Sequence, residues 1–275
     1  MWFTDPVSKN AAAVVTGAGS GIGRAFALEL AARGGRVVCS DVNETAARAT
    51  AKKIGKKQAI ALATDVTSIK AVTAMADRAR DWFGDEPDLV INNAGVAAGD
   101  RIGQMSLEDW RWVIDVNLWG VIHGCHVFAP RLQAAGRGAI LNVASAAAFG
   151  AAPAMGAYNV SKAGVLSLSE TLAAELSGTG VRVGVLMPTF VQTNIAKNSR
   201  TPASMREVAD KLMERTGVSA EFAARYALDA LDRDEIHILP QRDARVMWRF
   251  KRLFPTTNTR IAGRIRRVAD KYLDF

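Results

Sequence analysis

Short apolar runs alternate along the chain with longer segments in which apolar residues recur every three or four positions. Several of the short runs are almost continuous in Val, Ile, Leu and Ala, as is typical of strands covered on both faces. The longer segments predict helices at residues 21–33, 43–55, 68–83, 106–135, 157–178 and 219–232. The short runs predict strands at residues 11–16, 36–41, 59–64, 88–92, 138–144, 181–187 and 236–239.

This alternation predicts an α/β fold, with a doubly wound, parallel, seven-stranded sheet in a single domain. We expect the domain to span residues 11–239, after an N-terminal arm of residues 1–10 and before a C-terminal extension of residues 240–275. Residues 189–218 are polar and contain proline and glycine. They predict either a mobile loop with a short helix that covers a substrate site, or an ordinary surface excursion.

The composition is that of a globular protein, with 49% apolar and 23% charged residues. The two cysteines, Cys39 and Cys125, form no CxxC pair, so we expect reduced core thiols and a cytoplasmic protein. The first residues lack the basic and apolar layout of a signal peptide. No uncharged apolar run is typical of a membrane span.

The net charge of +8 is concentrated in residues 240–275, which hold ten Lys or Arg against three Asp or Glu. Val246, Phe250, Leu253 and Phe254 recur there near helical spacing beside arginines, which predicts a basic amphipathic helix. Its apolar side either packs on the body or a partner subunit, or makes peripheral contact with an anionic membrane surface. We expect no nucleic-acid binding, because the domain has no recognition motif or basic groove.

A glycine-rich turn follows the first predicted strand and opens the first predicted helix. Glycines let a pyrophosphate approach the main chain, and the start of the helix offers free N–H groups and a positive dipole end. Such a pattern is weak by itself, but here it has the strand and the helix that the motif requires. We therefore predict cofactor contacts from Thr16, Gly17, Ser20, Gly21, Ile22 and Gly23.

Asp41 ends the second predicted strand, where a carboxylate can accept hydrogen bonds from the adenosine ribose. The same charge would repel a 2′-phosphate, and no Lys or Arg stands at Gly19, Ser20, Val42 or Asn43 to neutralise one. The residue therefore favours NAD, with NADP as the second option. Alternatively, Asp41 caps the following helix, although Asn43 competes for that position.

Small and amide residues follow the third and fourth predicted strands. At the carboxyl edge of a parallel sheet they could line the adenine and the central part of a cofactor. Taken alone, either segment would be an unremarkable turn. The candidate cofactor residues here are Asp65, Val66, Asn93, Ala94 and Gly95.

Tyr158 and Lys162 stand four residues apart on a predicted helix, so their side chains share one face. A tyrosine needs a positive neighbour to exchange protons near neutral pH, and Lys162 supplies that charge, which we expect to lower the pKa of Tyr158. Ser145 ends the fifth strand and could hold a substrate oxygen, while Asn117 could hold a water within its helix. Tyr-x-x-x-Lys alone is more often a surface pair; the surrounding motifs favour catalysis.

Together these residues resemble the short-chain dehydrogenase/reductase superfamily, in its compact single-domain branch, over residues from about 10 to 240. The resemblance implies a Rossmann fold and an NAD(P)-dependent oxidoreductase. It implies that Tyr158 is the acid/base, that Ser145 orients the substrate and that Asn117 supports a relay water. The family more often has glycine at the position of Thr189. Further cofactor contacts implied are Tyr158, Lys162, Pro188, Val191 and Thr193.

The leading hypothesis is therefore hydride transfer between a nicotinamide and a secondary alcohol or ketone. An apolar pocket is indicated by Phe149, Ala151, Met155, Phe190, Ile195, Met205 and Met213. The alternatives are a non-catalytic dinucleotide sensor or scaffold, and an NADPH-linked ketoacyl- or quinone-type reductase.

Two further expectations concern metals and subunits. His123 and His126 lie three residues apart, but no carboxylate or cysteine set completes a site, so we expect helix packing or a subunit contact and no metal. By the resemblance, helices 106–135 and 157–178 form a homodimer or homotetramer.

Overall fold

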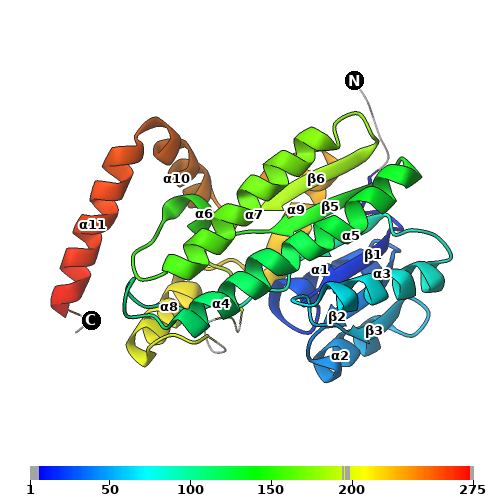
Figure 1. The fold of residues 1–275 in the computed structure, drawn as a ribbon, viewed down its shortest axis with the longest axis horizontal. Helices are drawn as coiled ribbons and strands as arrows, with labels where there is room; N and C mark the ends of the chain where they lie inside the picture. The colour runs from blue at the N-terminus through cyan, green and yellow to red at the C-terminus, as the bar shows by residue number, and fades with distance from the viewer. Residues whose placement is uncertain (1–5, 194, 196–198, 273–275) are drawn as a thin grey trace.

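The computed structural model describes residues 6–193, 195 and 199–272. Its centre is one seven-stranded sheet in which all neighbouring strands are parallel, in the order β3-β2-β1-β4-β5-β6-β7. This confirms the predicted fold class (Figure 1). The strands are β1 (Ala12–Thr16), β2 (Arg36–Asp41), β3 (Ala59–Ala63), β4 (Leu89–Asn92), β5 (Gly138–Val143), β6 (Val181–Leu186) and β7 (His237–Ile238).

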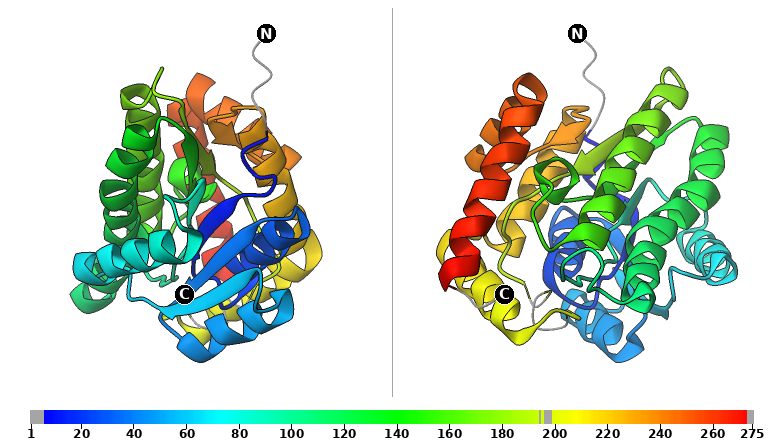
Figure 2. Two further views of the ribbon diagram at one scale, coloured as in Figure 1. Left: turned by 90° about the vertical axis from the view of Figure 1, so that its right-hand side faces the viewer. Right: turned by 60° about the vertical axis from the view of Figure 1, so that its left-hand side comes forward.

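Helices cover both faces of the sheet (Figure 1, Figure 2). They are α1 (Gly21–Ala32), α2 (Glu44–Ile54), α3 (Ile69–Phe83), α4 (Leu107–Ile114), α5 (Gly120–Ala135), α6 (Ala147–Gly150), α7 (Gly156–Glu175), α8 (Ala203–Thr216), α9 (Ala220–Asp232), α10 (Arg242–Leu253) and α11 (Pro255–Tyr272). A π-helical turn, η1 (Asp115–Trp119), joins α4 to α5.

The central strands are buried on both faces, and alternate side chains enter two different cores. Val15 packs with Phe26 and Leu30 of α1 and with α9, whereas Val14 packs with Phe128 of α5 and Val165 of α7. The continuous apolar runs in the sequence arise because neither face of the strands meets water.

The order of the strands reverses next to β1. The chain moves outward from β1 through β2 to β3, and then returns to place β4 on the other side of β1, with Val14 opposite Val90. Ligands of doubly wound sheets bind at the carboxyl ends of the strands near such a reversal. The glycine-rich turn after β1 and the amide segment after β4 meet at this point.

The predicted helix 106–135 is interrupted. It consists of α4, the π-helical turn η1 and α5, which follow one another without a loop. The short helix α6, directly after Ser145, was not predicted, because four residues are too few to show a helical period.

The N-terminal segment packs on the body through Val7 and Ser8. Ser8 is fully buried, and its main-chain N–H and hydroxyl both donate to the carboxylate of Asp232 at the end of α9 (2.9 and 2.6 Å). Arg33 donates to the same hydroxyl (2.8 Å). Part of the segment predicted as an arm therefore contacts the C-terminal ends of α1 and α9.

The C-terminal extension forms two helices, because Pro255 begins a new one. Helix α10 packs on the body through Ala244, Met247 and Trp248, whereas α11 lies beyond it at one edge of the molecule (Figure 1, Figure 2). None of the helices in the described parts of the chain is long and apolar enough to cross a membrane.

The side of α10 that packs is not the side that the sequence indicated. Val246, Leu253 and Phe254 are 67%, 72% and 53% exposed. Phe250, the fourth residue of the expected stripe, is half-buried, and its ring lies 5.5 Å from that of Phe254. Most of the expected stripe therefore faces away from the body, and a different set of residues, Ala244, Met247 and Trp248, packs on it. Helical spacing gives the period of a stripe but not the partner that each stripe meets.

Candidate active site

Thr16 and Asn93 tie the glycine-rich turn to the segment after β4. The Thr16 hydroxyl accepts hydrogen bonds from the main-chain N–H groups of Asn93 and Ala94 (3.0 and 3.1 Å). The Asn93 amide donates to the Thr16 carbonyl (2.8 Å). Both side chains are therefore occupied by the chain itself, and they shape the site at the reversal of strand order.

The glycines of the turn are required by close approach. Gly17 and Gly21 have φ of +65° and +51°, a region that favours glycine. A Cβ at Gly23 would lie 2.2 Å from the Gly17 carbonyl oxygen and 2.4 Å from Asn93 Nδ2. In the described part of the chain no side chain caps the first turn of α1, whose N-cap is Ser20. The main-chain N–H groups of this first turn are therefore available as hydrogen-bond donors to a pyrophosphate, and the turn fits such a group.

Asp41 lies beside the turn and does not cap α2. One carboxylate oxygen accepts from the Gly19 N–H (2.9 Å) and the other from the Asn43 N–H (2.9 Å). The cap is Asn43, whose side chain accepts from the Ala46 N–H (3.1 Å). The alternative reading of Asp41 as a helix cap is therefore wrong.

The segment after β3 is held by α5. The Asp65 carboxylate accepts from the main chain and hydroxyl of Thr67 (2.9 and 2.8 Å) and is exposed. The Val66 carbonyl oxygen lies 2.8 Å from His123 Nδ1, and Val66 itself is buried. His123 therefore has a packing role in the structure, as the sequence led us to expect.

Lys162 is buried beneath the catalytic candidates. Its ammonium donates to the Val143 carbonyl oxygen (2.9 Å) and lies 5.7 Å from the centre of the Tyr158 ring. Burial lowers the pKa of Lys162 to about 8. The ammonium is therefore near the phenol, as the four-residue spacing predicted, but it is less easily kept charged than a surface lysine.

Ser145, just after β5, lies close to Tyr158 near the start of α7. Burial raises the pKa of Tyr158, and the neighbouring Ser145 side chain lowers it by less. The expectation that Lys162 lowers this pKa is therefore not met by the chain alone. The protein environment favours the neutral phenol, because burial penalises the charged phenolate.

Asn117 lies in the π-helical turn η1 and is completely buried. Its side chain accepts from the Val96 N–H (2.8 Å) and donates to the Val96 carbonyl (2.9 Å) and to Ser161 Oγ (3.3 Å). A Cβ at Gly95 would lie 3.3 Å from Asn117 Oδ1 and 3.6 Å from Lys162 Nζ. Asn117 and Lys162 therefore face the same glycine.

The segment after β6 reaches both halves of the site. The Pro188 carbonyl accepts from the Ala146 N–H (2.8 Å), next to Ser145. Val191 is buried and pairs with Val218. A Cβ at Gly21 would lie 3.2 Å from the Thr193 methyl carbon, so this segment also contacts the glycine-rich turn.

Residues 189–218 contain a longer helix than expected, α8, and are joined to the loop after β4. The Arg200 N–H donates to the Ala97 carbonyl (3.0 Å) and its guanidinium donates to Asp109 Oδ1 (3.0 Å), which lowers the pKa of Asp109. The Arg200 guanidinium also stacks over Trp112, 4.2 Å from the ring centre.

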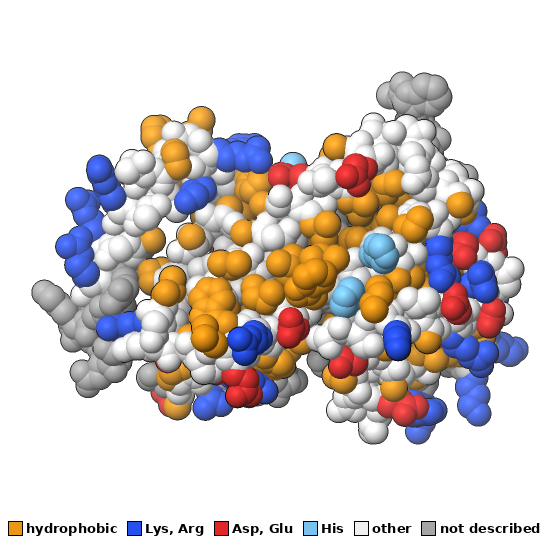
Figure 3. Space-filling view, in the orientation of Figure 1, with side chains coloured by type: hydrophobic (Ala, Val, Ile, Leu, Met, Phe, Trp, Pro, Cys, Tyr) orange, Lys and Arg blue, Asp and Glu red, His pale blue; other side chains and the backbone are white. Residues whose placement is uncertain are grey.

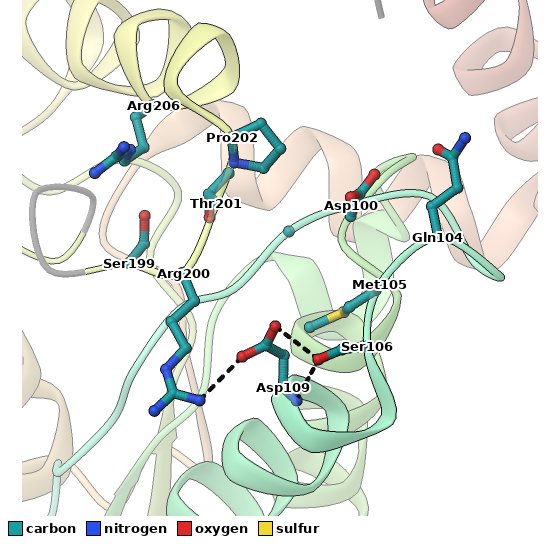
Figure 4. A pocket seen from close by; sticks show the side chains of 11 residues that line it. Asp100, Gln104, Met105, Ser106, Asp109, Ser199, Arg200, Thr201, Pro202 and Arg206 are labelled. Carbon is teal, nitrogen blue, oxygen red and sulfur yellow. Dashed lines mark hydrogen bonds and ion pairs between the residues drawn. The ribbon is translucent and has the colours of Figure 1, made fainter.

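A cavity of about 570 Å³ lies between this loop and α8, and Arg200 turns toward Asp109 at its floor (Figure 4). Its side chains are mainly polar. Phe149 and Met213, which were expected in an apolar pocket, are buried, and Phe149 packs on Trp248. The side chain of Met205 lies outside the described ones.

Two residues near the site were not singled out from the sequence. Arg24 donates to the Gly19 carbonyl and to Thr50 Oγ1, so a guanidinium supports the glycine-rich turn. Gln241 contacts the segment after Pro188 from the C-terminal extension. Arg24 could have been found from its place directly after Gly23; no local pattern marks Gln241.

Comparison with known proteins identifies the family to which this chain is similar. The family model described as short chain dehydrogenase matches residues 11–204. The 1-deoxy-11-beta-hydroxypentalenate dehydrogenase of Streptomyces exfoliatus is 37% identical over 243 residues, which cover 86% of each protein. The probable oxidoreductase EphD of Mycobacterium tuberculosis is 41% identical over 184 residues, covering 66% of this chain and 31% of that protein.

A solved structure gives the same result. The short chain dehydrogenase/reductase of Burkholderia phymatum in complex with NAD superimposes with a TM-score of 0.84 and 34% identity, over 92% of this chain and 95% of that one. The chain spans about a third of the length of EphD but most of the length of the other two proteins. The chain belongs to the short chain dehydrogenase family, whose members are NAD(P)-dependent oxidoreductases.

Proposed function

We propose that the protein transfers a hydride between a nicotinamide dinucleotide and a secondary alcohol or ketone, with Tyr158 as the acid/base. The observation that carries this proposal is the geometry around Tyr158: the buried Lys162 ammonium lies 5.7 Å from the centre of the phenol ring, and Ser145 is close enough to lower the pKa of the phenol. A sensor or scaffold would not need this arrangement.

In this mechanism Ser145 holds the substrate oxygen beside the phenol. During ketone reduction, Tyr158 donates its proton to the carbonyl oxygen; during alcohol oxidation, its phenolate accepts the hydroxyl proton. When bound, the nicotinamide supplies or accepts the hydride. Because burial raises the pKa of Tyr158, the chain alone favours the proton-donating form. Oxidation needs added positive charge near the phenol, from Lys162 and the bound cofactor.

The cofactor that the site fits best is NAD. Asp41 is fixed by the N–H groups of Gly19 and Asn43 beside the glycine-rich turn, where a carboxylate suits a ribose diol and repels a phosphate. The turn, the segment after β4 and Thr193 supply the remaining contacts. Lys162 would hold the nicotinamide ribose, and Pro188 and Val191 would flank the nicotinamide. Asn117, whose side chain bonds to the main-chain N–H and carbonyl of Val96, would support a water that relays protons to Lys162.

The substrate is proposed to be apolar. Ile102 and Phe190 are 80% and 37% exposed. Gly156 lies two residues before Tyr158, and a Cβ there would be 3.1 Å from Ile102. Residues 189–218 would cover the bound substrate. A panel of sterols, retinoids, long-chain alcohols and small secondary alcohols, screened for NAD reduction at 340 nm, tests the proposal. NADH binding without turnover of any alcohol or ketone would support the sensor alternative instead.

We further propose a homodimer or homotetramer through α4, α5 and α7. Hydrophobic side chains gather over these helices on one face of the molecule (Figure 3). Leu107, Trp119 and Val160 are 71%, 49% and 52% exposed there. Light scattering after size exclusion measures the state; substitution of Trp119 and Val160 by Ser should give a monomer.

The extension is proposed to make peripheral contact with an anionic membrane surface through the exposed stripe of Val246, Leu253 and Phe254. The alternative is a partner subunit on the same stripe. Co-sedimentation with anionic vesicles should decrease when these three residues are replaced by Ser; unchanged binding would contradict the membrane contact. The buried, reduced Cys39 and Cys125 support a cytoplasmic location.

A further inference from the structure

The first residue of the C-terminal extension to contact the site is Gln241, directly before α10. Its side chain is almost fully buried, at 8% exposed. Its Oε1 accepts from the Thr189 N–H (3.2 Å), and its Nε2 donates to the Phe190 carbonyl (2.9 Å). One amide therefore bonds to two successive residues of the segment after Pro188.

These two bonds extend a network that reaches Ser145. The Pro188 carbonyl accepts from the Ala146 N–H (2.8 Å), and the Phe190 carbonyl also accepts from the Val218 N–H (3.1 Å). The segment from 188 to 190 is thus held on one side by the turn that carries Ser145 and on the other by Gln241. A shift of this segment would move the residues proposed to flank the nicotinamide.

The Thr189 side chain adds a further contact with the C-terminal extension. Its hydroxyl lies 3.4 Å from Asp243 Oδ1. Where the family more often has glycine, this chain has a residue whose main chain and side chain both bond to the start of α10. The contact between the Thr189 hydroxyl and Asp243 exists only because this chain has threonine and not glycine at this position.

Helix α10 is itself held firmly, which makes Gln241 a fixed point. Ala244 is fully buried, and Arg245 donates to the carbonyls of Leu239 and Pro240 (2.9 and 3.1 Å), so the residues on both sides of Gln241 are fixed without Trp248. Gln241 therefore sits between a docked helix and a segment that has no regular secondary structure of its own.

We infer that Gln241 is a positioning residue, through which the C-terminal extension sets the main chain on the nicotinamide side of the site. The inference rests on the proposed function, because it assigns Pro188 and Val191 to the cofactor. Two variants can have the same loss of stability, one without the Gln241 amide and one altered within α10. The inference predicts that the first weakens cofactor binding more than the second.

The test compares Gln241→Leu with Trp248→Leu in the full chain. The first variant removes both hydrogen bonds with a side chain of similar size, and the second removes packing between α10 and α6 without touching Thr189 or Phe190. We expect Gln241→Leu to weaken NADH binding by about tenfold, as the loss of two main-chain partners implies. Trp248→Leu should change it by less than about twofold, at an equal or larger loss in Tm.

A second variant provides a readout that general destabilisation would not produce. In Gln241→Glu, the ionised carboxylate still accepts from Thr189 but cannot donate to the Phe190 carbonyl. When protonated, it can do both. Because a glutamate carboxyl ordinarily has a pKa of about 4.3, the ratio of the NADH dissociation constants of Gln241→Glu and the unaltered chain should fall toward one as pH decreases from about 7 to about 4. The same ratio for Gln241→Leu should stay flat.

Hydrogen exchange of the peptide that contains Thr189 reports the bond without any cofactor, and protection should be lost in Gln241→Leu. If protection is lost and NADH affinity is unchanged, or if Trp248→Leu weakens NADH binding equally, the inference is overturned while the proposed function stands. If the unaltered chain binds no NADH, both fall together.

Discussion

The two halves of the site are built differently. In the half after β1, Thr16, Asn93 and Asp41 are satisfied by neighbouring main-chain groups, and the glycines leave no room for substitution. In the half after β5, Lys162 is buried and Tyr158 is half-buried, and burial moves both pKa values toward the neutral forms. The first half is a closely packed main-chain surface. In the second half, burial disfavours the charged forms of the two reacting groups.

The largest expected effect concerns the second half. Tyr158→Phe removes the proton donor and should lower kcat by about 10²–10⁴-fold, the usual contribution of a general acid. NADH binding should change little, because the ring is kept. The measurement is steady-state turnover with fluorescence titration of NADH. Tyr226→Phe is the matched control, since Tyr226 Oη contacts Arg245 at the surface (3.3 Å); near-normal turnover of Tyr158→Phe would remove the acid/base assignment.

Lys162 should make stability depend on alkaline pH. Burial lowers its pKa from 10.5 to about 8. Between these values the unfolded chain binds the proton and the folded chain does not, so stability rises with pH across this window. Relative to Lys162→Met, the unaltered chain should gain on the order of 3 kcal/mol in unfolding free energy from pH 7 to 10.5.

Urea unfolding at half-unit pH steps measures this difference. The difference between the two proteins cancels the titration of groups that Lys162 does not influence. The titration of Tyr158, whose ring lies 5.7 Å from the ammonium, is removed by making both measurements in the Tyr158→Phe background. A flat difference would show that burial does not disfavour the charged form of Lys162, and the contrast between the two halves would be lost.

Gly23→Ala tests the closely packed half. The added Cβ would meet the Gly17 carbonyl oxygen at 2.2 Å, so the turn must shift, at about 1–3 kcal/mol of unfolding free energy. NADH binding should weaken with it. The control is Gly263→Ala in α11, where a Cβ meets nothing within 4 Å and a helix gains stability. Equal melting temperatures for the two variants would contradict a close-packed turn.

The smallest effect is one of cofactor choice. Asp41→Ala removes the negative charge and the acceptor of the Gly19 N–H. We expect the ratio of the dissociation constants for NADH and NADPH to shift by about tenfold toward NADPH, the equivalent of one charge-assisted hydrogen bond. Asp77→Ala, which loses a distant ion pair with Arg131 (2.8 Å), should leave the ratio unchanged. An unchanged ratio in Asp41→Ala would exclude it as the selector.

The halves also differ in how far the sequence could predict them. The glycine-rich turn, Asp41 and Asn93 lie next to predicted strand ends, and their contacts follow from the strand order. The spacing of Tyr158 and Lys162 predicted a shared helix face, and the structure places them together. In the chain alone the pKa of Tyr158 is raised and not lowered, because its shift depends on burial as well as on the spacing to Lys162.

The amino-acid sequence by itself determined the fold class, the position of the cofactor turn and the residues proposed for catalysis, because hydrophobic period and glycine placement act over a few neighbouring residues. Only the tertiary structure decided which stripe of α10 is buried, that Asn117 lies in a π-helical turn, and that Gln241 contacts Thr189 and Phe190. The Gln241 contacts join residues 51 and 52 positions apart, and the packing of Trp248 on Phe149 joins residues still further apart in the sequence. Their energies arise from neighbours that a linear pattern does not specify.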